Sequence, residues 1–502
     1  MNRLNAIFIV IFTIILGALF AFHNYGNNIS QNNLRKTSYE ISEDAKNQKN
    51  IHLPKLEDLS EIGQEGIKTS HAKAIINYLS FAKDHGLQSI DPAPIKQVLE
   101  NGKRLDDNQK QVLKDAVIKI ADELNGGRIN WNKARYDWDM RPKKIDNLAG
   151  FELALKNDDI ENWLKTLAPQ HDAYRALVGA RHKYSEIVKA GDFIKLGEIE
   201  ELKIGSNGSN VALLRARLNQ EGYNANNITS PEVFDENLKT KLALFQKYHG
   251  IKQSGTLNKE TLKALEISAK ERLEQIDLNL ERERWVPREI TKTRIEANIT
   301  SAHVAYIEDN KIKLEMPSIV GAIKSKTPML ASHIHSIVLN PPWYKPASIK
   351  GRVRVQKPGP NNALGRVKFD MANNHSVFLH DTPNHGLFSA HNRTLSHGCV
   401  RLHYPKDLAE ILAKAEGYNR EKIDEITKTV KTHRIKLKTK TPVLILYRTA
   451  YVDVFANDGG IVQFPKDVYS WDPLLKNLLF GTNIDENLGA ILAKDDRNVA
   501  AP

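Results

Sequence analysis

Cysteine is nearly absent from this chain, because Cys399 is the one cysteine among 502 residues. A single thiol excludes an intrachain disulfide and a zinc site built from several cysteines. Glycine (28) and proline (20) stand near average usage, which excludes collagen-like and low-complexity chains. Lysine and arginine outnumber aspartate and glutamate by 72 to 60 but form no dense basic run. The formal charge of +12 therefore favours an anionic lipid or an anionic polymer such as a bacterial cell wall, and no nucleic acid is expected as a partner.

The overall composition is that of a folded protein with several domains. Hydrophobic residues make up 41% and charged residues 26% of the chain, which excludes a mostly disordered protein. A chain of 502 residues corresponds to about three domains. The hydrophobic spacing changes along the chain from helical to alternating, so we expect a multidomain α+β fold.

Long hydrophobic runs are absent except at the N-terminus. Residues 6–22 carry no charge and would extend about 25 Å as a helix, at the short end for crossing a bilayer. The end of this run lacks the Ala-x-Ala spacing of a signal-peptide cleavage site. We therefore expect residues 1–23 to be a membrane anchor, with a cleaved signal peptide as the alternative; both export the rest of the chain. Residues 24–52 are polar and asparagine-rich and predict a flexible linker.

Two helical regions are predicted after this linker. Residues 53–200 have apolar side chains at helical spacing and no cluster of reactive side chains, which indicates a helical scaffold domain with helix ends at Gly86 and Gly127. Its clearest helix faces are Ala72, Ile75, Ile76 and Leu79, and then Leu113, Ala116, Val117 and Ile120. Residues 201–270 contain three short amphipathic stretches separated by glycines and predict a three-helix module.

The hydrophobic period changes to alternation beyond residue 275. Ile312, Leu314 and Met316 alternate with charged residues, which is typical of a half-buried strand. Further runs rich in β-branched or apolar residues lie at 318–321, 337–339, 376–379 and 443–447. One helical stretch interrupts them at residues 406–415. We therefore expect a mainly β domain over residues 275–475 and a C-terminal tail over residues 476–502.

The one thiol lies in the polar segment Ser396-His397-Gly398-Cys399. A free cysteine is most often a small buried hydrophobe, but this polar setting favours an exposed, reactive sulfur. A cysteine nucleophile needs a base or a positive neighbour that stabilises the thiolate near neutral pH. We therefore expect the rate of a reaction at Cys399 to follow its ionised fraction and to fall in acid.

Histidine supplies the candidate base. Eight of the 17 histidines lie in one window of the chain: His333, His335, His375, His380, His385, His391, His397 and His403. His380 follows the strand-like run 376–379 and precedes a turn at Asp381, so we expect it at the edge of a sheet. His385 and His391 are expected to be solvated.

These residues resemble the active-site signature of the L,D-transpeptidase catalytic domain. The signature combines His380, fifteen intervening residues and then Ser396-His397-Gly398-Cys399-Val400-Arg401. Residues 339–343, 358–369 and 379–383 are similar to the large membrane-anchored branch of that family from Gram-negative bacteria. Residues 201–268 resemble the small peptidoglycan-binding domain of cell-wall enzymes, although Ser230-Pro231 stands before Phe234 where that family usually has glycine.

The resemblance implies a peptidoglycan acyltransferase in the periplasm, attached to the inner membrane through the N-terminal segment. Cys399 would attack the third residue of a donor tetrapeptide stem and expel the terminal D-alanine. An acceptor stem's side-chain amine would then take the acyl group, which forms a 3→3 cross-link. No cofactor and no metal is implied. Carbapenems are expected to acylate the same thiol.

The resemblance also assigns roles around the thiol. His380 would act as general base, with a backbone carbonyl near Asp381 orienting its imidazole. Amides of Gly398 and Cys399 would form the oxyanion hole, supported by Ser396 and His397. The residues expected to contact substrate are Arg401, which would meet a stem carboxylate, and Trp343 and Tyr344, which would line the groove. The segment 344–357 is shorter than the lid usual in this branch, so a full lid is not expected.

Three alternatives remain open from the residues. Water in place of the acceptor amine would make the protein an L,D-carboxypeptidase or endopeptidase. A zinc peptidase could use the histidines with Cys399, although no His-Glu-x-x-His motif occurs. A non-catalytic peptidoglycan-binding protein would use only residues 201–268.

Overall fold

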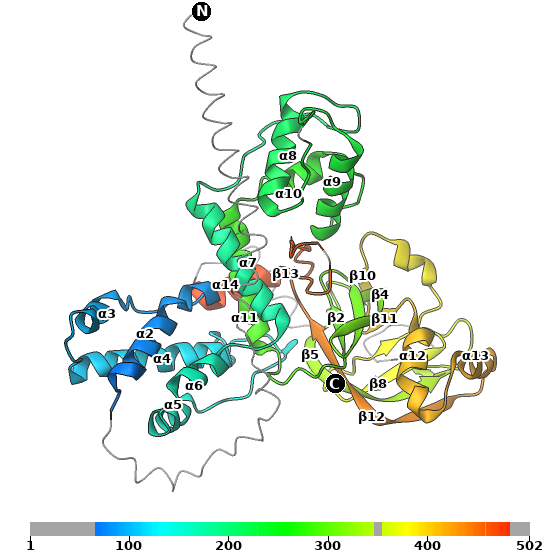
Figure 1. Cartoon of the computed structure of the whole chain (residues 1–502). Helices are drawn as coiled ribbons and strands as arrows, with labels where there is room; N and C mark the ends of the chain where they lie inside the picture. The colour runs from blue at the N-terminus through cyan, green and yellow to red at the C-terminus, as the bar shows by residue number, and fades with distance from the viewer. Residues whose placement is uncertain (1–65, 228, 346–353, 457, 482–502) are drawn as a thin grey trace, which may run out of the picture. The chain divides into compact units, whose positions relative to one another are not determined.

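The computed structural model describes residues 66–227, 229–345, 354–456 and 458–481 (Figure 1). The predicted anchor at residues 1–23, the predicted linker at 24–52 and most of the predicted tail at 476–502 lie outside these ranges. Within the described part of the chain, no helix combines the length and the apolar character needed to cross a membrane.

Helices form the first described region, as the hydrophobic spacing predicted. They are α2 (Thr69–Ser80), the 3-10 helix η3 (Ala82–His85), α3 (Ala93–Glu100), α4 (Asp107–Gly126), α5 (Asn147–Lys156), α6 (Ile160–Leu167) and α7 (Asp172–Lys189). The buried side chains of α2 include the four predicted ones, and α4 buries its predicted face as well. Gly86 and Gly127 follow η3 and α4 with φ of +68° and +73°, a region in which glycine carries no steric penalty.

Residues 201–270 form the predicted three-helix module, drawn in green in Figure 1. Its helices are α8 (Ser209–Glu221), α9 (Glu236–Tyr248) and α10 (Lys259–Leu265). Their apolar faces make a separate core that includes Leu214, Leu242 and Phe245. The turn containing Ser230-Pro231 is held by buried Arg215, whose Nε donates to the carbonyl of Pro231 at 3.0 Å.

The last region is a mainly β domain that begins after α11 (Ala269–Trp285). Its principal strands are β2 (Arg294–Asn298), β3 (His303–Glu308), β4 (Lys311–Gly321), β5 (Met329–Leu339), β8 (Val367–Met371), β9 (Leu379–His380), β10 (Thr394–Ser396), β11 (Val400–Leu402) and β12 (His433–Leu446). The sheet order is β5-β12-β2-β3-β4-β11-β9-β8, and β8 also pairs with β5. The sheet therefore closes on itself around a buried apolar core.

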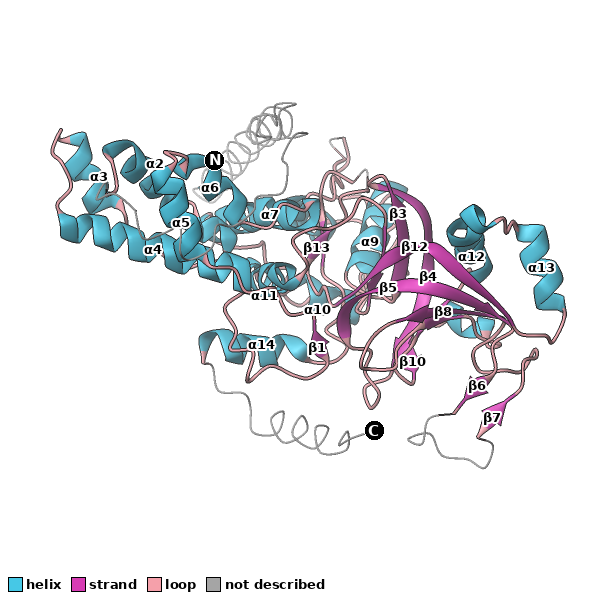
Figure 2. Cartoon of the chain, turned by 90° about the horizontal axis from the view of Figure 1, so that it is seen from below, coloured by secondary structure: helices cyan, strands magenta, loops and turns pink. Residues whose placement is uncertain are grey.

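The other elements of this domain surround the closed sheet. Two small hairpins are β6 (Trp343–Tyr344) with β7 (Val355–Gln356), and β13 (Tyr451–Val452) with β14 (Val462–Gln463). The helices are η4 (His385–Ser389), α12 (Pro405–Ala413), η5 (Lys414–Glu416), α13 (Arg420–Lys428) and α14 (Trp471–Phe480). Figure 2 shows β12, β5 and β8 running alongside one another in this sheet.

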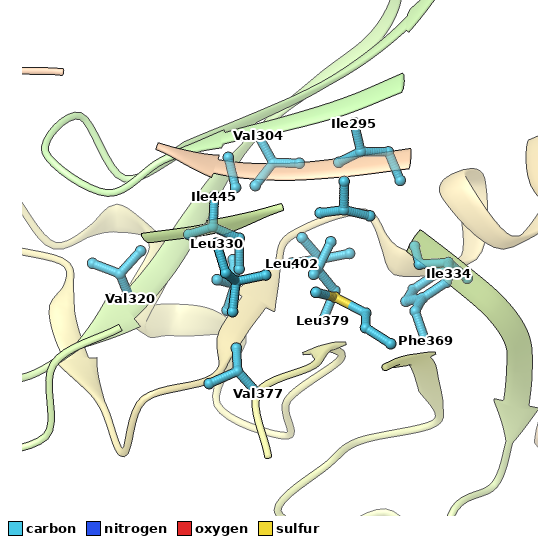
Figure 3. Packing of buried hydrophobic residues seen from close by; sticks show 14 of the residues in the cluster. Ile295, Val304, Val320, Leu330, Ile334, Phe369, Val377, Leu379, Leu402 and Ile445 are labelled. Carbon is cyan, nitrogen blue, oxygen red and sulfur yellow. The ribbon is translucent and has the colours of Figure 1, made fainter. Parts of the chain in front are cut away.

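The core of the β domain explains why its strands alternate in sequence. Figure 3 shows side chains from different strands converging in this core, among them Ile295, Leu330, Phe369, Leu379 and Leu402. Each of these five residues is at most 1% exposed. Successive side chains of a strand point to opposite faces, so every second residue reaches the core.

Three sequence predictions about these elements need correction. The predicted strand at 376–379 begins only at Leu379, because Ser376 has φ +54° and breaks the extended backbone. The boundary expected between residues 270 and 275 falls inside the continuous helix α11. The region predicted to be a helical scaffold also contributes strand β1 (Trp138–Asp139), which pairs parallel with β5.

Trp138 lies in the core of the β domain, where it is fully buried. Its ring centroid is 5.4 Å from that of Trp285 and 5.8 Å from that of Trp471. We expect Trp138→Ala to lower the free energy of unfolding by about 3–5 kcal/mol, because it leaves a large cavity in a closed sheet. Chemical denaturation of the full chain measures this loss. Tyr136→Ala is the control, since Tyr136 is 55% exposed; equal effects of the two changes would contradict the prediction.

Candidate active site

Cys399 lies in the short loop between β10 and β11, and its side chain is partly exposed. Strand β11 pairs with β4 on one side and runs parallel to β9 on the other. The register of the parallel pair sets Val400 opposite Leu379 and Arg401 opposite His380. The thiol therefore precedes β11 directly, while His380 ends the neighbouring strand. The Cys399 Sγ lies 3.9 Å from the Ser376 carbonyl and also accepts a hydrogen bond from the Phe378 backbone.

His380 is a buried histidine whose ring is oriented by backbone hydrogen bonds, with Asp381 and with Leu364. Its Nδ1 hydrogen-bonds the backbone carbonyl of Asp381. A carbonyl only accepts, so Nδ1 must carry the proton and Nε2 must carry the lone pair. This tautomer leaves a basic nitrogen on the other side of the ring. The contact is the one expected of a carbonyl that orients the imidazole of a general base.

Burial decides the charge of both groups. Burial, with the positive charge of Arg401 second, lowers the pKa of His380 to about 3. Burial likewise raises the pKa of the Cys399 thiol to about 11, although Lys368 and Arg401 favour the thiolate. Both shifts favour the neutral forms of the thiol and the imidazole in the resting protein. The expected stabilisation of the thiolate by a base or a positive neighbour therefore stays a prediction, since burial outweighs Lys368 and Arg401 here.

The loop before Cys399 is held by hydrogen bonds from buried hydroxyls. The Ser396 hydroxyl donates to the Cys399 carbonyl at 2.6 Å and accepts from the Gly398 amide at 3.1 Å. The Thr327 hydroxyl donates to the Gly398 carbonyl at 2.7 Å. Gly398 has φ +116°, a conformation that favours glycine. The Gly398 amide therefore already has a partner in Ser396, and its place in an oxyanion hole stays a prediction.

Asp381 closes the turn behind His380. Its carboxylate accepts from the amides of Arg366 and Thr382, each at 2.7 Å, and lies 3.2 Å from Nε2 of His385. Burial raises the pKa of this carboxyl. His385 was expected to be solvated; its side chain is 52% exposed but is also paired with Asp381. Asp381 thus supports the strand end that carries His380.

The predicted substrate-contacting residues divide into two groups. Arg401 is half-buried opposite His380, and its Nε has no hydrogen-bond partner among the described residues. His397 is exposed beside the thiol. Trp343 and Tyr344 form β6, and no hydrogen bond or ring contact joins them to Cys399, His380 or Arg401 within the described ranges. Residues 346–353 of the short segment 344–357 lie outside those ranges.

The remaining histidines of the window occupy separate places. His375 pairs with Asp139 of β1 at 3.1 Å, and His403 stacks on Tyr404. Among the described residues, no three His, Cys, Asp or Glu side chains are grouped so that they could hold a metal ion.

Sequence reasoning missed Thr327, which contacts the backbone next to the thiol. It belongs to no motif and is separated from Gly398 by 71 positions. No hydrophobic period covers Thr327 either, because it lies in the connection between β4 and β5.

Comparison with known families matches three parts of the chain. The model of the L,D-transpeptidase catalytic domain matches residues 292–445, that of a scaffold domain matches 62–180, and that of a peptidoglycan-binding domain matches 207–265. A curated protein of Haemophilus influenzae named "Putative L,D-transpeptidase" is 30% identical over 242 residues, which is 40% of this chain. The match spans about half, 48%, of that relative's length.

Solved structures of L,D-transpeptidases are also similar to the chain. An L,D-transpeptidase from Stackebrandtia nassauensis is 15% identical with a TM-score of 0.24, covering 49% of this chain and 94% of that one. The catalytic domain of the Enterococcus faecium enzyme acylated by ertapenem is 17% identical with a TM-score of 0.19, covering 32% and 99%. The domains of this chain are assigned from the three family models and not from these structures. This chain therefore contains an L,D-transpeptidase catalytic domain together with a scaffold domain and a peptidoglycan-binding domain.

Proposed function

We propose that the protein is a cell-wall L,D-transpeptidase that forms 3→3 peptidoglycan cross-links through an acyl-enzyme at Cys399. The observation that carries this proposal is the parallel register of β9 and β11, which sets His380 beside the strand that follows Cys399. The tautomer of His380 supports it, because Nδ1 donates to the Asp381 carbonyl and Nε2 is left basic.

The first half-reaction acylates the enzyme. His380 Nε2 takes the thiol proton as Cys399 Sγ attacks the carbonyl of the third stem residue. The tetrahedral oxyanion collapses, the amide bond to D-alanine breaks, and the imidazolium gives its proton to the leaving amine. The products of this step are free D-alanine and a thioester at Cys399. Because both groups start neutral, no charge has to be held in the buried site before substrate arrives.

The second half-reaction transfers the acyl group. The side-chain amine of an acceptor stem attacks the thioester, His380 accepts the amine proton, and the thiol is regenerated. Arg401 is the candidate for a stem carboxylate, since guanidinium groups pair well with carboxylates and its Nε is unpartnered among the described residues. The N-terminal run 6–22 supports export to the periplasm and attachment to the inner membrane.

Product analysis tests the proposal directly. We expect the full-length protein, incubated with purified disaccharide tetrapeptide, to release one D-alanine for each 3→3 dimer formed. Chromatography and mass spectrometry measure both products. Accumulation of tripeptide monomer without dimer would assign the hydrolytic alternative instead. An unchanged substrate, with the protein shown to be folded, would contradict acyl transfer at this site.

A further inference from the structure

The peptide unit between Gly398 and Cys399 is held from one side by Thr327. The Thr327 hydroxyl donates to the Gly398 carbonyl at 2.7 Å, and both Thr327 and Gly398 are buried. Peptide bonds in the described chain are trans, so the carbonyl and the N–H of one unit point in opposite directions. Fixing the Gly398 carbonyl toward Thr327 therefore directs the Cys399 amide away from Thr327.

The Cys399 amide is a backbone donor of this loop that has no hydrogen-bond partner among the described residues. The Gly398 amide donates to the Ser396 hydroxyl, whereas the Cys399 amide makes no hydrogen bond with any described residue. Cys399 itself is partly exposed to solvent, as a residue that an incoming substrate must reach has to be. The carbonyl on the other side of Cys399 is also fixed, because it accepts the Ser396 hydroxyl at 2.6 Å.

A closed ring of hydrogen bonds holds Thr327 in place. The Gly321 amide donates to Thr327 Oγ1 at 2.8 Å, and the Thr327 amide donates to the Tyr469 hydroxyl at 3.1 Å. The Tyr469 hydroxyl in turn donates to the Gly321 carbonyl at 2.6 Å. Because Oγ1 accepts from an N–H, its one proton is available for the Gly398 carbonyl.

Tyr469 is anchored in the same manner. Its own amide donates to the Tyr447 hydroxyl at 2.8 Å, and its ring stacks on that of Tyr447 with centroids 5.6 Å apart. Thr327 and Tyr469 are at most 2% exposed. The ring is therefore shielded from water and rigid, as a group that orients a catalytic dipole must be.

We propose that Thr327, held by Tyr469, is a positioning residue that aims the Cys399 amide at the oxyanion formed during acylation. The inference rests on the proposed function, because an oxyanion develops here only if Cys399 attacks a carbonyl. Threonine suits this place because one hydroxyl both accepts from Gly321 and donates to the Gly398 carbonyl. Valine has nearly the same shape but can do neither.

The test compares two reactions of the same thiol in full-length protein. Acylation by a carbapenem passes through an oxyanion, whereas alkylation by iodoacetamide displaces iodide and forms none. We expect Thr327→Val to slow acylation about 10- to 100-fold, somewhat less than the loss of a whole oxyanion donor. Alkylation should stay within about twofold of wild type, and Thr327→Ser, which keeps the hydroxyl, should restore most of the acylation rate.

Tyr469→Phe is the second variant, because it removes the hydroxyl that holds Thr327 without touching the loop. We expect a smaller selective loss of acylation, again with alkylation unchanged. An equal fall of both rates in Thr327→Val and Tyr469→Phe, or no fall of acylation in either, overturns this inference while wild type is acylated normally. Wild-type protein that is alkylated but never acylated overturns the proposed function and this inference with it.

Discussion

Replacing Cys399 by alanine is expected to abolish acylation and cross-linking while the protein stays folded. The chain has no second thiol that could take over the attack. The Sγ atom makes only weak polar contacts with the described backbone, at 3.9 Å to the Ser376 carbonyl and with Phe378, so its loss should change the thermal midpoint little. The flanking loop is held by Ser396 and Thr327 and does not depend on the thiol.

Mass spectrometry of carbapenem-treated protein measures this prediction. Wild-type protein should gain one inhibitor mass, and peptide mapping should locate it at Cys399. Cys399→Ala should gain none, with circular dichroism showing an unchanged fold. Cys399→Ser is a matched control that retains a hydroxyl of similar size but a much weaker nucleophile at neutral pH. An adduct that persists in Cys399→Ala, or full cross-linking by it, would contradict the mechanism.

Replacing His380 by glutamine is expected to slow acylation about 10²- to 10⁴-fold near pH 7, the usual contribution of a general base. Glutamine keeps much of the side-chain volume and can still donate to the Asp381 carbonyl. The matched control is His385→Gln, because His385 also touches the Asp381 region but is half-exposed and has no part in the proton transfer. Its acylation rate should stay within about threefold of wild type.

The pH dependence of the two proteins separates the roles further. Burial lowers the pKa of His380 to about 3, so its basic form persists far below the ordinary histidine value, and wild-type acylation should be nearly constant from about pH 5 to 8. The His380→Gln variant lacks a general base, so only the ionised fraction of Cys399 can attack the inhibitor. Since burial raises the pKa of Cys399 to about 11, the variant's rate should climb about tenfold per pH unit.

Stopped-flow or quenched mass-spectrometric rates across that pH range decide the matter. A wild-type rate that falls through about pH 6.5 would show that His380 titrates like an exposed histidine. A flat profile for His380→Gln would show that the thiol is already ionised in the resting enzyme. Either result would contradict the neutral pair.

Local patterns in the sequence were enough to predict the helical elements and to single out a candidate nucleophile and a candidate base. The faces of α2 and α4, the three helices α8, α9 and α10, and the ends at Gly86 and Gly127 depend on side chains a few positions apart. The buried face of a helix repeats every three to four residues, and glycine permits a helix-ending backbone at its own position. Both features can therefore be recognised in a single sequence. The spacing of His380 and Cys399 was visible because both residues belong to one short stretch of the chain.

Tertiary structure alone decided how the thiol is presented. Trp138 joins the core of the β domain, although that domain begins more than 130 positions later in the chain. The pairing of β1 with β5 places it there, and its ring contacts that of Trp285. Thr327 reaches the Gly398 carbonyl across 71 positions, and Tyr469 reaches the Thr327 amide across 142. The hydrogen bond from the Gly398 amide to Ser396 depends on the same loop conformation. Burial in this domain shifts the pKa values of His380 and Cys399 toward their neutral forms.

The physical reason for this division is that hydrophobic period encodes which face of an element is buried, but not what it is buried against. A hydrogen bond between a hydroxyl and a distant carbonyl depends on the closure of the sheet through β8 and β5, which no local pattern contains. The sequence determined the elements, the nucleophile candidate and its base candidate. The closed sheet determined their charge, their hydrogen-bond partners and the direction of the amide beside the thiol.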